Sequence, residues 1–491
     1  MTILLWTLIC AQIVMGGLDT LGHHEVTERL AWRDSQRREL RLHALRNLFY
    51  GFVLAGLATV QPTGWPALAL IAVLAAEFLI TLRDFAEEDA TRKLPVTERL
   101  LHTVLTANYG AILALLIPVL LTWSREPAGL DPVWHGWMSV ICLLGALACT
   151  GLAIRDWLAS NRFARLRTRP LARIAAPTAA PQTVLVTGGT GFIGQRLIPA
   201  LQETGHRVVL LARDGNVRGL RPPFTVVERL DDIPNDRRID TVVNLAGAPI
   251  LAGPWTRAAR HRIRDSRIAT TQDVVRLIDR LHTRPATLIQ GSAIGVYGVE
   301  AGRVNERTPI RRDGSFSQAL CLDWEAEAAK AAGIRTVFLR IGIVLDRAGG
   351  ALGQMLVPTE YAGGMRLGRG DQRMSWIGRD DLVRLVLHLI ERPEVQGPVN
   401  AVSGIATNRD FTRSLARALH RPSWLAAPTW LLRRVGMGRE ILLADQAVTA
   451  RDIGFMPLDR DLDTFLAANL GRRSAPRNAA SRASLALDSA P

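Results

Sequence analysis

The sequence predicts an α/β protein with a doubly wound parallel sheet and a small C-terminal substrate region, preceded by an all-α transmembrane domain. Three observations support this fold class. Residues 1–158 contain long, nearly uncharged apolar runs. From residue 183 onward apolar and charged residues alternate, and an apolar strand at 183–186 leads into a glycine-rich turn and a helix. Further short apolar strands then alternate with helical patterns, which is typical of a parallel sheet covered by helices on both faces.

Five apolar runs approach the roughly 20 residues that a helix needs to cross a bilayer. They lie at residues 2–18, 47–60, 65–82, 101–123 and 134–154. The second and third runs are short, and the Gln-Pro-Thr-Gly sequence at 61–64 predicts a tight turn between them. A cleaved signal peptide is the alternative for the first run, but that run lacks a basic start and a small-residue cleavage site. We therefore expect about five spans.

The distribution of arginines predicts the orientation of these spans, because basic residues near helix ends remain on the cytoplasmic side. The segments after the first and third runs are rich in basic residues, whereas residues 61–64 have none and residues 124–133 have only Arg125. A basic stretch and an Ala/Pro-rich linker follow at 159–182. We expect an integral protein of a bacterial inner membrane, with the lipid bilayer as a partner and the C-terminal half in the cytoplasm.

The formal net charge of +15 does not indicate a nucleic-acid partner. Lysine occurs only at Lys93 and Lys330, so the positive charge is almost entirely arginine and is spread along the chain. Neither a DNA- nor an RNA-recognition motif accompanies it. We therefore expect no nucleic acid among the partners.

Cysteine use predicts neither a disulfide framework nor a metal-binding knuckle, because the spacing shows no pairs. The cysteines are Cys10, Cys142, Cys149 and Cys321. Cys321 is expected to be a reduced thiol, consistent with a cytoplasmic C-terminal half.

Carboxylates and histidines gather in the predicted cytoplasmic segments of the membrane half. They are Asp19, His23, His24, Glu25, Glu28, Asp84, Glu87, Glu88, Asp89, Glu98 and His102. Glu98 and His102 are four residues apart and would share one face of a helix, and such ligands suit iron, manganese or zinc. Acidic residues interleaved with arginines more often form a solvated ion-pair surface. The prediction therefore assigns no metal site and keeps metal binding as an alternative.

The strand at 183–186 runs directly into Thr187-Gly188-Gly189-Thr190-Gly191-Phe192-Ile193-Gly194, and a helical pattern follows at 195–203. Gly188 permits a tight turn, Gly191 lets the backbone approach a pyrophosphate, and Gly194 lets the helix pack closely on the strand. The motif predicts a dinucleotide-binding (Rossmann) domain. Its candidate cofactor residues are Gly188, Thr190, Gly191, Phe192, Ile193 and Gly194.

A second apolar strand at 207–211 ends where a side chain that contacts the ribose is expected, about 20 residues after the turn. Arg213 stands there, with Asp214 beside it. An acidic residue would bind the 2′-hydroxyl of NAD, whereas an arginine can pair with the 2′-phosphate of NADP. Arg213 predicts NADP as the cofactor. NAD, and a merely solvated Arg213 at the strand end, are the alternatives.

A third strand at 241–243 leads into Asn244-Leu245-Ala246-Gly247-Ala248, whose small residues would let the backbone pass beside the cofactor. Asn244, Ala246 and Gly247 therefore join the predicted cofactor site. Further strands are predicted at 287–290 and 337–339, and helices at 267–281 and 323–332.

The glycine turn together with Asn244-Leu245-Ala246-Gly247 resembles the extended short-chain dehydrogenases/reductases, the superfamily of sugar-nucleotide epimerases and dehydratases. A more specific resemblance, to the atypical epimerase-family subgroup, covers residues 183–470. Its motifs include Ser292-Ala293-Ile294-Gly295-Val296-Tyr297-Gly298, Cys321-Leu322-Asp323-Trp324-Glu325 and Met374-Ser375-Trp376-Ile377. The resemblance implies an oxidoreductase- or epimerase-type domain that binds NAD(P), with a characteristic C-terminal region. One departure is Gly378, where the subgroup usually has histidine.

Enzymes of this superfamily use a tyrosine and a lysine four residues later, and the lysine lowers the pKa of the tyrosine. Neither Tyr297 nor Tyr361 has such a lysine, and the resemblance places Cys321 and Glu325 at the positions of the pair. Ser292 matches the superfamily serine that hydrogen-bonds the substrate, with capping of the strand end as the alternative. Ser292 and Tyr297 are the candidate catalytic residues.

The predicted domains are a transmembrane helical domain at 1–158, the linker at 159–182, an NAD(P)-binding Rossmann domain at 183–396, a C-terminal epimerase-family region at 397–470 and a disordered tail at 471–491. Two functions remain open. One is a membrane-anchored NADP(H)-binding oxidoreductase or epimerase-like enzyme with a small-molecule substrate. The other is a non-catalytic NADP(H)-dependent sensor or binding protein at the membrane. The sequence identifies neither the substrate nor the oligomeric state.

Overall fold

The computed structural model of the chain describes residues 2–20, 22–23, 30–32, 36–91, 96–165, 168–178, 180–213, 215, 217, 219–250, 255–434 and 438–470. It forms two compact units, Met1–Arg167 and Thr168–Pro491. The predicted tail at 471–491 and Asp214 lie outside the described residues.

The first unit is mainly helical, and each predicted apolar run lies mostly within one of its helices. The helices are α1 (Ile3–Asp19), α2 (Arg37–Thr59), α3 (Trp65–Thr91), α4 (Val96–Trp123) and α5 (Trp137–Arg165). Helix α2 packs against α3 and α5, and α4 packs against α1 and α3. Leu5, Leu57 and Leu116 are among the apolar side chains buried between them. Helix α5 continues past residue 159, where the linker was predicted to begin.

Three helical stretches among the described residues are long and apolar enough to cross a membrane, judged by length and composition. They are Trp65–Asp89, Val96–Trp123 and Trp137–Asn161. Helix α1 is apolar but has only 17 residues. Helix α2 begins with a charged segment, so the apolar run at 47–60 forms only its second half.

Residues 61–63 form a strand, so the prediction of a tight turn at 61–64 is wrong for most of that segment. The strand β1 (Val60–Thr63) pairs antiparallel with β2 (Gly129–Pro132), which lies between α4 and α5. The Thr63 hydroxyl donates a hydrogen bond to the carbonyl of Pro127 at 2.8 Å. The turn is confined to Gly64, whose φ of +64° favours glycine. Extended pairing with a distant loop satisfies backbone groups that a tight turn would leave free.

Several acidic and histidine side chains of α3 and α4 are buried, so the predicted solvated ion-pair surface is wrong for them. Glu88 is 1% exposed, Glu98 is 0% exposed, and Asp84 and His102 are also buried. These residues face the interior of the helical unit because neighbouring helices pack over the ends of α3 and α4.

The second unit is built on a seven-stranded, entirely parallel sheet with the order β13-β9-β7-β6-β3-β4-β5. Its strands are β3 (Thr183–Thr187), β4 (Arg207–Leu211), β5 (Thr225–Val227), β6 (Thr241–Asn244), β7 (Thr287–Ala293), β9 (Arg335–Ile341) and β13 (Gly397–Ala401). The order reverses between β3 and β6, as in a doubly wound fold. The predicted fold class is therefore confirmed.

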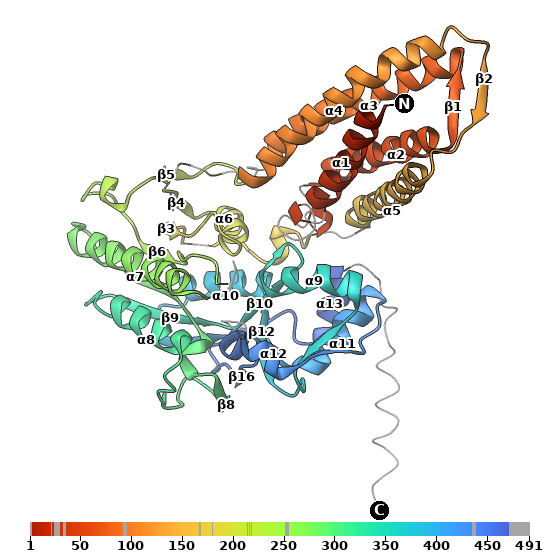
Figure 1. Cartoon of the computed structure of the whole chain (residues 1–491). Coiled ribbons are helices and arrows are strands. Elements are labelled where there is room, and N and C mark those ends of the chain that lie inside the picture. Colours follow the sequence, from red (N-terminus) through yellow and green to blue (C-terminus); the bar gives the residue numbers. More distant parts are fainter. Residues whose placement is uncertain are drawn as a thin grey trace, which may run out of the picture. The chain divides into compact units, whose positions relative to one another are not determined.

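Helices cover both faces of this sheet (Figure 1). Alternate strand residues enter two separate apolar cores, one with α6 (Gly194–Glu203) and α10 (Arg379–Glu391), the other with α7 (Arg257–Arg280) and α8 (Phe316–Ala328). Thus Val184 and Val186 face the first core, while Leu185 faces the second. Strands buried on both faces require the nearly continuous apolar sequences that predicted them.

The C-terminal region is not separate from the sheet, since β13 completes one edge although it lies beyond the predicted boundary at 396/397. Smaller sheets carry the rest of this region. They comprise β10 (Ile343–Asp346), β12 (Arg373–Gly378) and β14 (Gly404–Thr407), then β11 (Met365–Leu367) with β15 (Leu425–Ala427), and β8 (Glu300–Val304) with β16 (Asp445–Val448). The remaining helices are α9 (Gly350–Ala362), α11 (Asn408–Leu419), α12 (Thr429–Arg434) and α13 (Leu462–Leu470).

Candidate functional site

The glycine turn after β3 has the geometry that close packing requires. Gly188 has φ +70°, and a Cβ there would lie 2.6 Å from the carbonyl oxygen of Leu245, which follows β6. A Cβ at Gly194 would lie 2.3 Å from the Cα of Gly189, so α6 can pack here only without a side chain. Gly191 is exposed and would meet only the Gly188 oxygen, at 3.1 Å. The turn therefore leaves an open backbone cradle before α6, at the point where the strand order reverses, which suits a pyrophosphate.

Of the other three predicted residues of the turn, one has an exposed side chain and two are packed against the protein. Thr190 is exposed beside Gly191. Phe192 packs its ring under the Arg379 guanidinium, 5.0 Å from the ring centroid, and against Gly350 of α9. Ile193 is partly buried against the apolar core. Thr190 can thus reach a ligand, whereas Phe192 and Ile193 hold the turn in place.

The Asn244 side chain connects three neighbouring strands instead of facing an open site. It is fully buried, accepts a hydrogen bond from the Thr187 hydroxyl at 2.5 Å, and donates to Gln290 at 2.9 Å. It also donates to the Thr271 hydroxyl of α7 at 3.0 Å. The Thr187 hydroxyl in turn accepts from the backbone N–H of Ala246 at 3.3 Å. Asn244 thereby fixes the backbone after β6 at the edge of the cradle.

Arg267 of α7 contacts the backbone after β6. The sequence analysis did not predict this role. Its guanidinium donates to the Ala248 carbonyl at 3.1 Å and lies 5.2 Å from the Trp324 ring centroid. A Cβ at the exposed Gly247 would lie 2.8 Å from the guanidinium carbon of Arg267. Burial lowers the pKa of Arg267 to about 10. A charged side chain buried under this loop makes the loop rigid where a cofactor would pass.

A second polar cluster lies beside the cradle, at the carboxyl ends of three strands. Ser292 of β7, Arg340 of β9 and Asn400 of β13 are direct neighbours in the strand register. Arg340 donates to both oxygens of Glu325 from α8, at 2.9 and 2.8 Å. It also donates to the Tyr297 hydroxyl at 3.0 Å. Parallel register thus brings together residues that are far apart in the sequence.

Both candidate catalytic hydroxyls belong to this cluster. The Ser292 hydroxyl donates to Glu325 at 2.6 Å, and the Tyr297 hydroxyl donates to the Asn400 side chain at 2.9 Å. Burial raises the pKa of Tyr297, and the hydrogen bonds from Arg340 and to Asn400 offset this rise only in part. For Arg340, burial opposes the charge, but the hydrogen bonds to and attraction from Glu325 prevail and raise its pKa. At neutral pH the phenol is therefore protonated and the guanidinium charged.

Cys321 lies one helical turn before Glu325 on α8 and is buried. Burial, reinforced by the nearby Glu325 carboxylate, raises the pKa of the Cys321 thiol to about 12. A neutral thiol in this position is a poor nucleophile and a poor base. The structure therefore agrees with a packing role for this cysteine.

A surface cavity of about 440 Å³ opens beside Tyr297. Strand β8 and residues 308–313 form most of its wall. The cationic residues of its lining are Arg303, Arg311, Arg312 and Arg439, and the acidic ones are Glu300 and Asp313. Tyr297 is the link between this cavity and the cluster at the strand ends.

Comparison with known proteins identifies the α/β unit. The model of the NAD dependent epimerase/dehydratase family matches residues 184–402. The epimerase family protein YfhF of Bacillus subtilis (strain 168) is 34% identical over 258 residues, which cover 51% of this chain and 84% of that protein. The chain belongs to the NAD-dependent epimerase/dehydratase family. The chloroplastic SDR39U1 homolog of Arabidopsis thaliana, also an epimerase family protein, is 36% identical over 291 residues, or 56% of this chain and 82% of the relative.

A solved structure supports the same assignment. The crystal structure of human epimerase family protein SDR39U1 (isoform 2) with NADPH is 31% identical, with a TM-score of 0.53, and covers 59% of this chain and 99% of that chain. The match to the family model runs from β3 to just beyond β13, so the helical unit lies outside it. The family assignment therefore concerns the α/β unit.

Arg340, Asn400 and Gln290 are members of the site that sequence reasoning missed. Arg340 lies within the apolar strand Arg335–Ile341, and a charged residue inside such a strand was the available signal. Asn400 and Gln290 gave no comparable signal, because a single amide in a strand is common. The predicted roles of Ser292 and Tyr297 stay predictions.

Removing the Glu325 carboxylate should destabilise the α/β unit, because it leaves Arg340 buried without its counter-charge. We expect Glu325→Ala to lower the free energy of unfolding by about 3–5 kcal/mol, measured by urea titration of the full chain. Glu327→Ala on the same helix breaks an ion pair with the exposed Lys330 and should change it by less than about 1 kcal/mol. Equal losses in the two variants would contradict a structural role for the Glu325–Arg340 pair.

Proposed function

We propose that this protein is an NADP(H)-dependent oxidoreductase held at the inner face of a membrane by its helical unit. The proposal rests on the open backbone of the glycine turn, which lies where the strand order reverses, and on the polar cluster of Ser292 and Arg340 beside it. Gly188, Thr190 and Gly191 would hold the pyrophosphate, and the backbone after Asn244 would lie along the cofactor. When bound, the nicotinamide ring donates or accepts a hydride.

Arg213 supports the choice of NADP over NAD. It follows the end of β4 and is exposed, and no hydrogen-bond or ion-pair partner for it lies among the residues that the structure describes. A guanidinium available at this position can form charge-assisted hydrogen bonds with a 2′-phosphate. The human relative solved with NADPH agrees with this choice.

The Ser292–Glu325 pair would carry the proton in place of the tyrosine–lysine pair of the superfamily. The Ser292 proton already points to Glu325, so the lone pairs of this hydroxyl remain to accept a hydrogen bond from a substrate hydroxyl. The substrate proton would pass to the serine oxygen while the serine proton passes to the carboxylate. Tyr297, which stays protonated, would donate to or orient the same substrate oxygen.

The arginines around the cavity beside Tyr297 favour a small anionic substrate. Arg303, Arg311 and Arg312 can pair with a carboxylate or phosphate, while the reacting hydroxyl or carbonyl lies towards Tyr297. We therefore propose a small acidic alcohol or carbonyl compound as the substrate class.

A non-catalytic NADP(H) sensor is the second candidate, because both candidate catalytic hydroxyls already donate to protein groups. Their acceptors are Glu325 and Asn400. Cys321 and Glu325, at the positions that the superfamily gives to tyrosine and lysine, cannot act as that pair. A sensor would need the cradle and Arg213 but neither Ser292 nor Tyr297.

The membrane proposal rests on the outward surface of the helical unit. Leu79, Leu144 and Leu147 are more than half exposed on α3 and α5, as expected for side chains that face lipid. Trp65, Trp134 and Trp137 are exposed near the β1–β2 end, and tryptophan favours the membrane interface. Five spans would place the end of α5, and the α/β unit that follows, in the cytoplasm.

Calorimetric titration of the full chain tests the cofactor. We expect NADPH to bind more tightly than NADH, and Arg213→Ala to weaken NADPH about 10- to 100-fold, because charge-assisted hydrogen bonds contribute about 1.5–3 kcal/mol. NADH affinity should not change. Arg207→Ala, at the other end of β4, is the matched control and should leave both affinities unchanged. Equal binding of NADPH to the Arg213 and Arg207 variants would refute the assignment of the 2′-phosphate site.

An assay for substrate conversion distinguishes the proposed enzyme from the alternative, a non-catalytic sensor. With a panel of small hydroxy and keto acids and either form of the cofactor, we expect at least one substrate to be converted. The Ser292→Ala/Tyr297→Phe double variant should then lose about 100-fold or more in rate while cofactor affinity is kept. Ser423→Ala with Tyr361→Phe, both exposed, is the control. Cofactor binding without conversion of any compound, or a double variant as active as the control, would favour the sensor.

Fractionation of cells tests the anchor. We expect the full chain to stay with the membranes after washing with high salt and alkaline carbonate, and to be released by detergent, because apolar helices are held by lipid and not by charge. Green fluorescent protein fused after residue 470 should fluoresce, and alkaline phosphatase fused there should be inactive. Release by carbonate would exclude spanning helices, and an active phosphatase would reverse the proposed orientation.

A further inference from the structure

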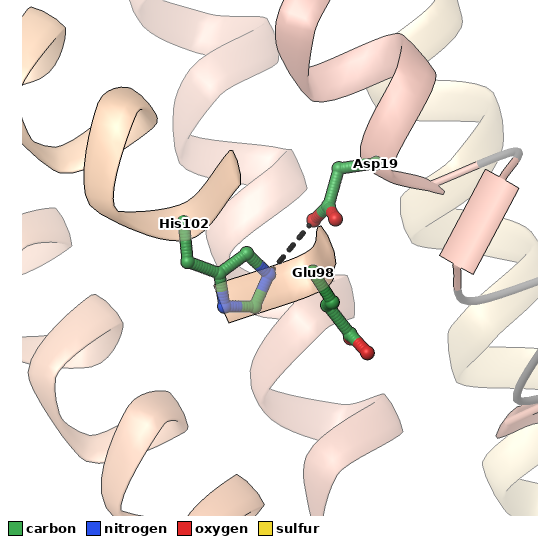
Figure 2. A group of neighbouring side chains, drawn as sticks. All are labelled: Asp19, Glu98 and His102. Atoms are coloured by element: carbon green, nitrogen blue, oxygen red, sulfur yellow. Dashed lines mark hydrogen bonds and ion pairs between the residues drawn. The ribbon is translucent and has the colours of Figure 1, made fainter. Parts of the chain in front are cut away.

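Two groups of buried carboxylates and histidines lie in the helical unit. They are found at the end where α1 and α3 finish and α2 and α4 begin. In each group one potential ligand atom from every residue lies within 4.8 Å of the others. The first group consists of Asp19, Glu98 and His102, and the second of Glu39, His43 and Glu88. Figure 2 shows the first group, in which the His102 Nε2 and an Asp19 oxygen are 3.0 Å apart.

Helical spacing explains how the ligands converge. Glu39 and His43 on α2, Asp84 and Glu88 on α3, and Glu98 and His102 on α4 are pairs four residues apart. Residues at this spacing share one face of a helix, so each helix presents two polar groups to the same interior space. Paired inward-facing carboxylates and histidines on several helices are how helical bundles hold two metal ions.

Glu88 connects the two groups. Its Oε1 lies 3.6 Å from the His43 Nε2, and its Oε2 lies 3.5 Å from the His102 Nδ1. The two oxygens of one carboxylate are therefore directed to histidines of different groups. Because His102 faces Asp19 with Nε2 and Glu88 with Nδ1, Glu88 is a candidate ligand of the second group and can orient the His102 ring of the first group through its other nitrogen.

The distances between these atoms suit coordination. Metal bonds to imidazole nitrogen and carboxylate oxygen are about 2.1 Å long, so neighbouring ligand atoms on one ion lie about 3 to 3.5 Å apart. The 3.0 Å between Asp19 and His102 lies within this range, and the 3.6 Å between Glu88 and His43 lies just above it. Small side-chain movements would place each group around an ion.

Burial makes a purely ionic network expensive. Asp19, Glu39, Glu88 and Glu98 are all at most 3% exposed, and carboxylates removed from water need strong compensation. Asp84 is fully buried as well. Its Oδ2 is paired with Arg46 at 2.7 Å and with His43 at 3.1 Å, whereas its Oδ1 has no hydrogen-bond partner within the described part of the chain. A divalent cation would offset the charge of several carboxylates at once.

We propose that the helical unit binds a pair of divalent first-row transition-metal ions at these two groups, with Glu88 as a ligand of the second ion and as the carboxylate that orients His102 at the first. Mixed imidazole and carboxylate ligands suit iron, manganese or zinc better than magnesium or calcium. Asp19, Glu98 and His102 hold one ion, and Glu39, His43 and Glu88 hold the other. The site is independent of the dinucleotide cradle, so the helical unit has a chemistry of its own besides anchoring.

Metal analysis of the full chain in detergent tests the site. We expect the protein, purified without chelators, to contain about two ions of iron, manganese or zinc per chain. His102→Gln should reduce this to about one, because only the first group loses a ligand. Glu88→Gln should remove the second ion and weaken binding of the first, because the second group loses a ligand and His102 loses the carboxylate that orients it. The matched controls are His135→Gln, a histidine in the loop before α5, and Glu87→Gln, the neighbour of Glu88 on α3. Both controls should keep the wild-type metal content.

Titration of the metal-free wild-type chain with Co²⁺ tests the site without any variant, so the test does not depend on a variant that fails to fold. After removal of metal with a chelator, Co²⁺ is added and its visible absorption is followed. Bands of cobalt bound by nitrogen and oxygen, saturating at about two equivalents, are expected. Wild-type protein that holds no more metal than background and gives no cobalt bands would overturn the proposal and leave a hydrogen-bonded ionic network. Equal metal content in the His102 and His135 variants would overturn it too.

Discussion

A guanidinium buried at the carboxyl edge of the sheet determines the arrangement around the candidate active site. Arg340 stands on β9, next to the edge strand β13, and its charge can be buried there only with a counter-charge and with acceptors for its N–H groups. Glu325 provides the counter-charge, and Tyr297 provides a further acceptor. Ser292 and Asn400 then complete the hydrogen bonding of Glu325 and Tyr297. Ordering of these five side chains thus follows from a single buried charge.

The backbone cradle for the cofactor depends on glycines, because its turn has no room for side-chain atoms. Gly188 and Gly194 leave no room for a Cβ, and the backbone after β6 closes against the turn. The Asn244 amide, bonded to Thr187 and Gln290, holds that backbone in position. A rigid, open backbone surface beside a charged cluster is a suitable base for redox chemistry on a bound dinucleotide, since it orients cofactor and substrate without closing the site. Membership of the family supplies the fold, and the fold by itself does not define the reaction.

The interior of the helical unit contains more than a membrane anchor would require. A membrane anchor requires apolar outward faces, which α3, α4 and α5 have. It does not require interior carboxylates and histidines from four helices, which are costly to bury. Their concentration at one end of the unit is the observation on which the proposed metal site rests. Metal chemistry in one unit and nicotinamide chemistry in the other would join two redox-capable sites in one chain.

By itself, the sequence determined the fold class, the apolar helices and the dinucleotide turn, because each depends on a local pattern. Apolar length, strand–glycine–helix order and alternation of elements are all visible over a few tens of residues. Only the tertiary structure decided which polar residues meet. Arg340 and Asn400 became neighbours of Ser292 through parallel register, and Glu88 came between His43 and His102 through helix packing. It also decided burial, so that residues expected on a solvated face proved to be interior. Contacts between distant segments depend on how elements pack, and no local pattern encodes that.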